Sequence, residues 1–479
     1  MKPTFPRATV ALLAASLAGP AAWAAEAPAG KTAPSTTLLN DWLRAQSPEF
    51  KAWDLGGQIR FRYEDKPNAG TFPNADFIAA GPANDDEFIL FRERLHLGYQ
   101  PESWLKFYVE AQDASGYWDE RTPSPNTDVF DLQQAYLQWG DGKKCPFSLK
   151  LGRQELVYGD ERFVGRGDWS NTGRVFDAIK LRAEGSAGWV DGFTSHVVVP
   201  YDDHFNESND EDWFSGVYAA TRRGVPWQET QVYCLVRNYS AAAADAIAPG
   251  VPGSPKTARD IVTFGTLWKS LPGKLGGWDY SLEVAGQLGT VNSGGVRRDQ
   301  RSYAVFASGG YTLTKAWASP RLGIGYEHGS GDSNPNDGTV ETFENVFGTQ
   351  HRPYGQMDLF GARNMHIPKL SLTAKPAKNF TVGVDYLWFI LADPNDYLYP
   401  ESGSGRSGNG YGIHPGYDAY VGSELDLVGT YTFKNWGVLQ AGYGHFFVGE
   451  YVTQSVGSVP ANGGTTDADW FFAQVTFNF

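Results

Sequence analysis

The stretch Gln58-Ile59-Arg60-Phe61-Arg62-Tyr63-Glu64 alternates strictly between polar and apolar side chains. Every odd position is apolar and every even position is polar, which is the period of a half-buried β-strand and which a helix cannot produce. The same alternation recurs over Leu105–Gln112 and Gln134–Trp139. The sequence therefore predicts an all-β fold whose strands have one apolar and one polar face.

Runs of this kind continue to the end of the chain and predict about eighteen strands, each long enough to cross a membrane at a tilt, for which roughly 9–11 residues suffice. The predicted strands are 54–65, 86–100, 103–113, 129–140, 147–158, 174–184, 189–201, 213–222, 228–240, 259–270, 276–291, 299–314, 319–330, 366–376, 379–392, 418–434, 436–450 and 468–479. The ninth and tenth strands alternate poorly, so they are the weakest of these predictions.

The connections between these strands alternate in length. Every second link is short, as at Pro101-Glu102 and Ala377-Lys378, and the links between them are long and polar, as at 331–365 and 393–417. Short turns on one side and long loops on the other are typical of bacterial outer-membrane barrels. We therefore expect an antiparallel transmembrane β-barrel with an even strand number and both termini in the periplasm.

The first residues of the chain predict export. Lys2 and Arg7 precede an apolar run that is too short to span a bilayer, and Ala22-Trp23-Ala24 supplies a cleavage site. We predict a signal peptide over 1–24, a periplasmic N-terminal linker with a short helix near Leu38–Ala45 over 25–52, and the barrel over 53–479. This organisation locates the protein in the outer membrane of a Gram-negative-type bacterium.

The last residues predict membrane insertion. Phe471, Ala473, Val475 and Phe477 occupy alternate positions, and the sequence stops on Phe479. A closing strand with an apolar face has to pair with the first strand, because lipid offers no partner to an open edge. A terminal Phe on such a strand resembles the signal that the barrel-assembly machinery reads, so we expect that machinery to be a partner.

The composition excludes several other functions. The formal charge is −14 and no run of Lys and Arg exists, which argues against nucleic-acid binding. His96, His328 and His445 lie near no nucleophile motif, so no catalytic site and no cofactor are expected. Cys145 and Cys234 have no metal-ligand spacing, and a disulfide between them stays possible. Acidic loops leave calcium open, but no metal site is predicted.

The polar faces of the predicted strands carry the candidate functional residues. If odd residues face lipid in the first strands, a basic group of side chains faces the lumen: Arg60, Arg62, Arg92, Arg94, Lys106, Lys180 and Arg182. Acids that oppose them come mostly from the C-terminal half: Glu283, Glu327, Asp385, Glu424 and Asp426. Basic rings set anion selectivity in pores, and the planar fork of Arg suits a carboxylate. The alternative is that these charges only pair with one another.

Several sequence blocks resemble the alginate export family of outer-membrane proteins. They are Leu151–Leu156 with Tyr158–Gly165, Trp169, Arg174, Phe176 and Asp177; Val346–Gly348 with His351, Gly355–Phe360 and Asn364; and Gly422–Leu427 with Gly442–Phe447. The resemblance implies an eighteen-stranded porin with an electropositive lumen that conducts an anionic uronate polysaccharide such as alginate. It also implies that Arg153 contacts the cargo.

Arg153 is the position where alternation and resemblance disagree. It lies in phase with Leu149 and Leu151, which puts it on the lipid-facing side. An unpaired Arg there costs roughly 2–4 kcal/mol. The sequence therefore predicts a register break at Gly152 that turns Arg153 inward, near Glu155, Asp160 or Asp177.

Three functions follow from these observations. The first is a monomeric channel for anionic polysaccharides or oligosaccharides, in contact with outer-membrane lipid and lipopolysaccharide. The second is a general or hydrocarbon-type porin with a structural arginine belt, which a lumen blocked by loop 331–365 and lined with aromatics would favour. The third is an outer-membrane enzyme, which the lack of a nucleophile and base disfavours.

Overall fold

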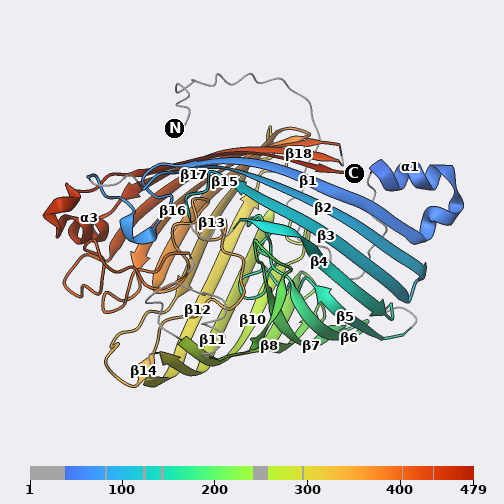
Figure 1. Cartoon of the computed structure of the whole chain (residues 1–479), viewed down its shortest axis with the longest axis horizontal. Helices are drawn as coiled ribbons and strands as arrows, with labels where there is room; N and C mark the ends of the chain where they lie inside the picture. The colour runs from blue at the N-terminus through green and yellow to red at the C-terminus, as the bar shows by residue number, and fades with distance from the viewer. Residues whose placement is uncertain are drawn as a thin grey trace.

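A computed structural model describes residues 38–80, 84–121, 126–141, 145–240, 257–293, 296–401, 403–434 and 436–479. The predicted signal peptide lies outside the described residues. The described chain forms a single sheet of nineteen strands, which rolls into a closed wall (Figure 1). One of the nineteen, β14 (Thr339–Val340), is a two-residue strand within a loop, so the wall has eighteen long strands.

Each predicted strand corresponds to one strand of the wall. The strands are β1 (Trp53–Lys66), β2 (Asp86–Glu102), β3 (Leu105–Tyr117), β4 (Asp128–Trp139), β5 (Phe147–Gln154), β6 (Phe176–Gly185), β7 (Gly188–Val199), β8 (Glu207–Thr221), β9 (Gln228–Tyr239), β10 (Thr257–Ser270), β11 (Trp278–Ser293), β12 (Val296–Thr312), β13 (Arg321–Gly329), β15 (Met365–Ala377), β16 (Phe380–Leu391), β17 (Tyr420–Phe433), β18 (Gly437–Val448) and β19 (Ala468–Asn478). The weakly alternating strands β9 and β10 are among them, and they pair along their length.

The wall is closed by pairing of the first strand with the last. β1 pairs antiparallel with both β2 and β19, so the blue and red ends of the chain lie side by side in Figure 1. Phe479 extends this pairing, because its N–H donates to Gly57 O and its carbonyl accepts from Gly57 N, both at 3.0 Å. The only parallel pairing of named strands among the described residues is that of β14 with β12. The closed antiparallel barrel is thus confirmed.

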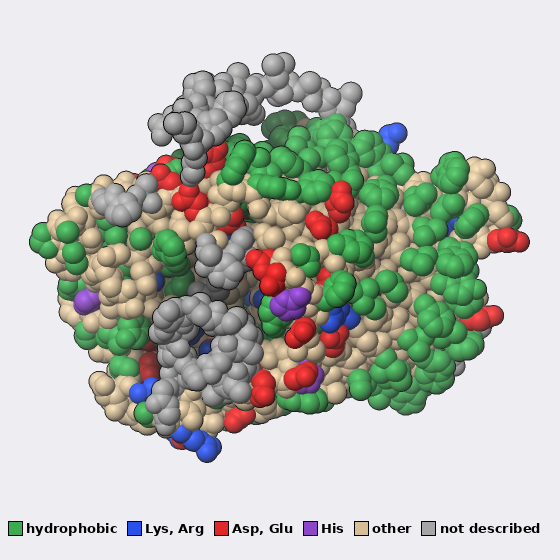
Figure 2. All heavy atoms as spheres, in the orientation of Figure 1, with side chains coloured by type: hydrophobic (Ala, Val, Ile, Leu, Met, Phe, Trp, Pro, Cys, Tyr) green, Lys and Arg blue, Asp and Glu red, His purple; other side chains and the backbone are tan. Residues whose placement is uncertain are grey.

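The two faces of the wall differ in exposure as the alternation predicts. In β1, Arg60 and Arg62 are 3 % and 2 % exposed, whereas Phe61 between them is 41 % exposed. Apolar side chains therefore point outward and the arginines point into the barrel. Figure 2 shows the hydrophobic side chains gathered on the half of the wall toward α1, with acidic and other polar groups toward the opposite end.

The two ends of the barrel are distinct. At the end with the short turns, α1 (Leu38–Gln46) is held to β1, because Asn40 Nδ2 donates to Asp54 Oδ1 at 2.8 Å. The 3₁₀ helix η1 (Pro48–Ala52) links α1 to β1. The end with the long loops carries η2 (Pro73–Ala75), α3 (Glu450–Gly457) and η3 (Pro460–Asn462). No described helix is long and apolar enough to cross a membrane.

Most strands begin or end within a few residues of their predicted bounds, and β5 and β8 show two of the differences. β5 ends at Gln154 rather than at 158, because the chain leaves the wall there and enters the barrel. β8 begins at Glu207, before the predicted 213, in a polar run that shows no alternation. The early end of β5 is the departure that matters for the site.

Candidate functional site

Arginines on two neighbouring strands face each other across the inner wall. Arg60 of β1 lies directly opposite Arg92 of β2 in the strand register, and Arg94 follows on the same face. Like charges in directly opposite positions destabilise a sheet unless another group compensates them. The compensating group comes from the loop that follows β5.

Residues 155–175, hereafter inner loop A, connect β5 to β6 through the inside of the barrel. Tyr158 Oη donates to Asp191 Oδ2 of β7 at 2.9 Å, and Arg162 Nη2 lies 2.6 Å from Glu327 Oε1 of β13. Ser281 Oγ of β11 donates to Asp160 Oδ2 at 2.6 Å. Since these wall residues face inward from separate parts of the barrel, inner loop A crosses the lumen.

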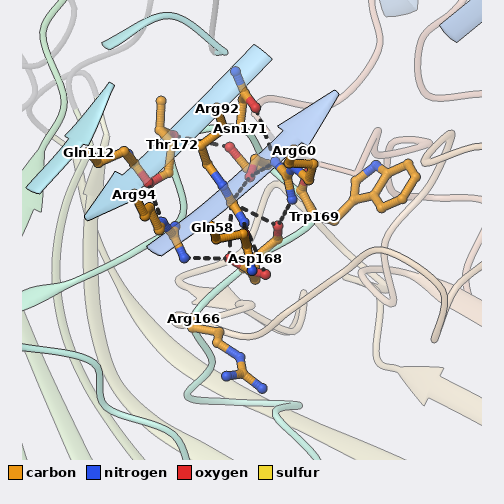
Figure 3. A network of polar contacts seen from close by, with 12 residues as sticks. Gln58, Arg60, Arg92, Arg94, Gln112, Arg166, Asp168, Trp169, Asn171 and Thr172 are labelled. Carbon is orange, nitrogen blue, oxygen red and sulfur yellow. Dashed lines mark hydrogen bonds and ion pairs between the residues drawn. The ribbon is translucent and has the colours of Figure 1, made fainter. Parts of the chain in front are cut away.

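Inner loop A places the Asp168 carboxylate among the arginines (Figure 3). Arg92 Nη1 and Arg94 Nη1 each lie 3.0 Å from Asp168 Oδ1. Arg60 Nη1 donates to the Asp168 carbonyl at 2.6 Å. Two amides orient the guanidinium groups, because Gln58 Oε1 accepts from Arg92 Nη2 at 2.6 Å and Gln112 Oε1 accepts from Arg94 Nε at 2.7 Å.

The cluster is positively charged overall. Arg60, Arg92 and Arg94 carry three positive charges against the one negative charge of Asp168, which leaves two in excess. Burial of the Asp168 carboxyl opposes its ionisation, but Arg92, Arg94 and Arg60 outweigh this effect and hold the pKa of Asp168 well below its ordinary range. The Asp168 side chain is still 42 % exposed to the lumen. The site therefore stabilises a carboxylate in a position that solvent reaches.

Arg62 fixes the next residue of the loop. Its Nη1 donates to the Trp169 carbonyl at 2.7 Å, and its guanidinium lies 3.8 Å from the centre of the Trp169 ring. Its Nε lies 2.8 Å from Glu64 Oε1, and Glu64 in turn accepts from Trp470 Nε1 at 2.9 Å. Arg62 is thus neutralised by Glu64 and positions inner loop A instead of adding free charge.

A second segment, residues 341–364 or inner loop B, packs on inner loop A inside the barrel. Phe347 N donates to Phe163 O at 3.0 Å, and Gly165 N donates to Phe347 O at 2.9 Å. Phe163, Phe343, Phe347 and Phe360 belong to one buried apolar cluster. Two hydrogen-bonded loops and their aromatic rings therefore occupy the interior, as in the second function considered from the sequence, although the entry of inner loop A was not predicted.

The predicted acids of the C-terminal half hold inner loop B. Glu424 Oε1 accepts from the backbone N–H groups of Gln356 at 2.7 Å and Met357 at 3.1 Å, and Asp426 Oδ2 accepts from Gln356 N at 3.2 Å. Asp385 lies opposite Asp426 in the register of β16 and β17. Glu424 and Asp426 are almost fully buried against inner loop B.

The remaining predicted cations face inward nearer the short-turn end. Arg182 makes two hydrogen bonds to Asp191, at 2.6 and 2.9 Å, and Lys180 Nζ lies 3.9 Å from the same carboxylate. Lys106 Nζ lies 5.0 Å from the centre of the Tyr108 ring and has no ion pair within the described residues. Lys106 is thus not neutralised by a direct salt bridge, whereas Arg182 is.

The predicted register break at Gly152 is wrong. Leu149 to Gln154 pair residue by residue with β6, and Leu149 to Arg153 pair in the same way with β4. The irregularities lie instead in the pairing of β3 with β4, where the register shifts between Glu110 and Ala111, which leaves Gln133 unpaired, and again between Gln112 and Ala114. Gly152 is required for a different reason: its φ is 113°, and a Cβ would meet Ala135 O at 2.3 Å.

Arg153 accordingly lies on the outer face, which corrects the lumen position that the resemblance implied. Its register partner Asp177 shares a face with Ile179 and Leu181, which are 54 % and 50 % exposed. Of the three acids proposed as partners, Asp177 is the one that pairs with it, through Nε–Oδ1 and Nη2–Oδ2 distances of 2.9 and 3.0 Å. Bidentate pairing removes the need to turn the side chain inward.

A second group of inward arginines was missed by the sequence analysis. Arg237 of β9, Arg259 of β10 and Arg363 before β15 surround Glu344 of inner loop B. Arg237 and Arg259 lie in the two strands with the poorest alternation, so no face was assigned to them. Asp168 was missed because its position depends on the path of inner loop A and not on any local pattern.

The cysteines and the acidic groups show no further site. Cys145 and Cys234 are free cysteines. Across the part of the chain that the structure describes, no group of three or more His, Cys, Asp or Glu side chains is arranged to hold a metal ion.

Comparison with known proteins identifies a family and several solved structures with a similar barrel. A family model described as alginate export matches residues 52–464. No curated protein matches the sequence. Among solved structures, the barrel is similar to OccK1 (OpdK) of Pseudomonas aeruginosa, with a TM-score of 0.53, 12 % identity and coverage of 89 % of this chain and 98 % of the other. It is also similar to OccD3 (OpdP) of the same organism, with a TM-score of 0.54, 10 % identity and coverage of 90 % and 91 %.

A third similar structure, OpdK of Pseudomonas aeruginosa with vanillate, has a TM-score of 0.52, 11 % identity and coverage of 89 % of this chain and 98 % of the other. At these identities the structural likeness shows the fold alone. The family match and the porin fold together place the chain in the outer membrane.

Proposed function

This chain belongs to the alginate export family, and from that premise we propose that it passes anionic saccharides, such as a uronate polysaccharide, through its arginine-lined lumen. The chain is an outer-membrane channel of the porin type, and its relatives are channels and not enzymes. We expect the protein to act as a monomeric barrel in contact with lipid and lipopolysaccharide. We also expect the barrel-assembly machinery to recognise Phe479.

The observation that carries the proposal is the Asp168 carboxylate held by Arg92 and Arg94 beside Arg60. A carboxylate of the protein occupies a position in the lumen that a uronate carboxylate would also occupy. Three buried nitrogen atoms of the cluster, Arg60 Nε, Arg92 Nε and Arg94 Nη2, have no hydrogen-bond partner among the described residues. Unpaired buried donors cost about 1–3 kcal/mol each, so the cluster favours a further acceptor.

The proposal predicts the sign of the ion selectivity. The double variant Arg92→Ala and Arg94→Ala reduces the cluster from two excess positive charges to none, because Arg60 and Asp168 remain. We expect the reversal potential in a salt gradient to shift from anion preference toward zero, and block of the current by oligo-guluronates to weaken.

The matched control is the double variant Arg222→Ala and Arg301→Ala. These side chains are 52 % and 65 % exposed at the two ends of the barrel, so the total charge changes equally while the lumen does not. An unchanged reversal potential in the lumen variant, with a folded barrel shown by heat-modifiable gel mobility, would contradict the proposal.

A second candidate is a porin for small or apolar solutes with a structural arginine belt. The filling of the interior by inner loops A and B, with Phe163, Phe343 and Phe347 in their contact, favours it. Liposome swelling separates the two candidates. Uptake of vanillate or neutral aromatics without any effect of oligo-guluronate would support the small-solute porin, whereas competition by oligo-guluronate supports the anionic saccharide channel.

A further inference from the structure

Arg237, Arg259 and Arg363 form a second basic cluster near the long-loop end of the lumen. Arg237 is two residues from the end of β9 and Arg259 is two residues after the start of β10, and the connection between those strands is long. Arg237 points inward in phase with Tyr233 and Leu235, which are 5 % and 1 % exposed. Arg259 points inward in phase with Ile261, which is 2 % exposed.

The three arginines share one carboxylate of inner loop B. Glu344 Oε1 lies 3.3 Å from Arg259 Nε and 3.8 Å from Arg237 Nη1, and Glu344 Oε2 lies 3.9 Å from Arg363 Nη2. Charge-assisted hydrogen bonds measure about 2.7–2.9 Å, so these contacts are electrostatic and not directed. Glu344 is anchored through its backbone instead, because Glu344 N donates to Gln287 Oε1 at 2.9 Å.

Arg259 lies nearest of the three to the Glu344 carboxylate but makes the fewest hydrogen bonds. Asp212 neutralises Arg237 through hydrogen bonds of 3.0 and 2.7 Å, and Arg363 donates to the Gly403 carbonyl at 2.7 Å. The terminal nitrogens of Arg259 make no hydrogen bond to any described residue, and its side chain is 21 % exposed. A guanidinium fork near the mouth of the lumen is therefore available to a ligand.

The electrostatics of Glu344 support the same conclusion. Burial opposes ionisation of this carboxyl, yet Arg259, Arg363 and Arg237 together lower the pKa of Glu344 below its ordinary value. The cluster thus creates a potential that favours a carboxylate, as the cluster around Asp168 does. Inner loop A supplies the Asp168 carboxylate to Arg92 and Arg94, and inner loop B supplies the Glu344 carboxylate to three arginines. The two loops are joined where Phe347 N donates to Phe163 O and Gly165 N donates to Phe347 O.

We propose that Arg259, together with Arg237 and Arg363, is a second carboxylate-binding station, which takes a carboxylate of the cargo at the position that Glu344 now occupies. This inference rests on the proposed function. It further defines the cargo as a polyanion, because a chain with repeated carboxylates engages the stations at Arg92 and Arg259 together, whereas a single carboxylate engages one at a time. Linked binding of this kind raises affinity without any new type of contact.

The test measures block of the single-channel current by glucuronate and by oligo-guluronates of increasing length, added to both chambers. For Arg259→Gln we expect the half-blocking concentration of long oligomers to rise about tenfold, the size expected for one lost charge-assisted hydrogen bond. Glucuronate block should change much less, so the dependence on oligomer length flattens. Glu344→Gln removes the competing carboxylate, so we expect tighter block by both ligands.

Arg301→Gln is the matched control, because it removes the same charge from the outer surface, where the side chain is 65 % exposed. If wild-type channels are not blocked by any uronate, the proposed function itself fails. If block occurs and weakens in Arg92→Gln but is unchanged at every oligomer length in both Arg259→Gln and Glu344→Gln, the second station alone is refuted.

Discussion

The contacts of Arg153 explain why an arginine can lie on the outer face of the barrel. Its guanidinium group is held on the outer face by the Asp177 carboxylate and by two backbone carbonyls, Leu132 O at 3.2 Å and Asn206 O at 3.3 Å. Only 13 % of its side chain is exposed, against 34 % for Asp177. An Arg beside lipid is tolerable in this protein because its charge is paired and its donors are used.

Removing one member of the Arg153–Asp177 ion pair should lower the free energy of unfolding more than removing both members. We expect Asp177→Leu to destabilise the barrel by about 2–4 kcal/mol, because it leaves an Arg without a carboxylate next to lipid. The double variant Arg153→Leu and Asp177→Leu should be close to wild type, since an ion pair is often replaceable by apolar groups. Reversible urea unfolding in phospholipid vesicles measures both. A double variant that is as unstable as Asp177→Leu would show that Arg153 is needed for another reason.

At the scale of elements, the strands were predictable and the inner loops were not. Alternation is a local property of the chain, so it predicted the strands of the wall, least clearly β9 and β10, and the inward faces of Arg60, Arg92 and Lys106. The path of inner loop A depends on contacts with Asp191, Glu327 and Arg92, which lie far away in sequence. The resemblance identified the segment that forms this loop but assigned the cargo contact to Arg153 and not to the wall around Asp168.

Removing the charge of Asp168 in inner loop A should shift the ion selectivity in the opposite direction to removing Arg92 and Arg94. Asp168→Asn removes the carboxylate that Arg92 and Arg94 share, which leaves three excess positive charges where there were two. We expect stronger anion preference and larger current fluctuations, because the loop loses its charged tether to β2. Bilayer recordings measure both. Asp203→Asn, at a side chain that is 77 % exposed, is the control; equal effects of the two variants would refute the role of Asp168.

At the scale of the whole molecule, closure of the barrel depends on where β1 and β19 meet. Phe479 makes two backbone hydrogen bonds to Gly57, and a Cβ at Gly57 would lie 2.6 Å from the Phe479 ring. The missing side chain at Gly57 thus makes room for that ring. An unpaired edge at this point would expose backbone groups to lipid, where each costs several kcal/mol.

Deletion of Phe479 should therefore weaken closure as well as assembly, and two measurements separate these effects. Refolding of purified protein into detergent, followed by heat-modifiable mobility, reports closure alone. The amount of folded barrel in cell membranes reports closure and assembly together. We expect a modest loss of folded barrel after refolding in detergent and a larger loss of folded barrel in cell membranes. Normal values in both would show that Phe479 is dispensable.

The early end of β5 has a consequence for the history of this channel. The wall closes through backbone pairing that does not involve residues 155–175, whereas contacts that set the charge of the lumen depend on them. The family resemblance is carried partly by Tyr158–Gly165, Trp169 and Arg174 of this same stretch, and Tyr158, Phe163 and Val164 belong to the buried apolar cluster. We therefore expect related channels to retain this loop, and substitutions at its lumen-facing charges to change the lumen without breaking the strand pairing of the wall.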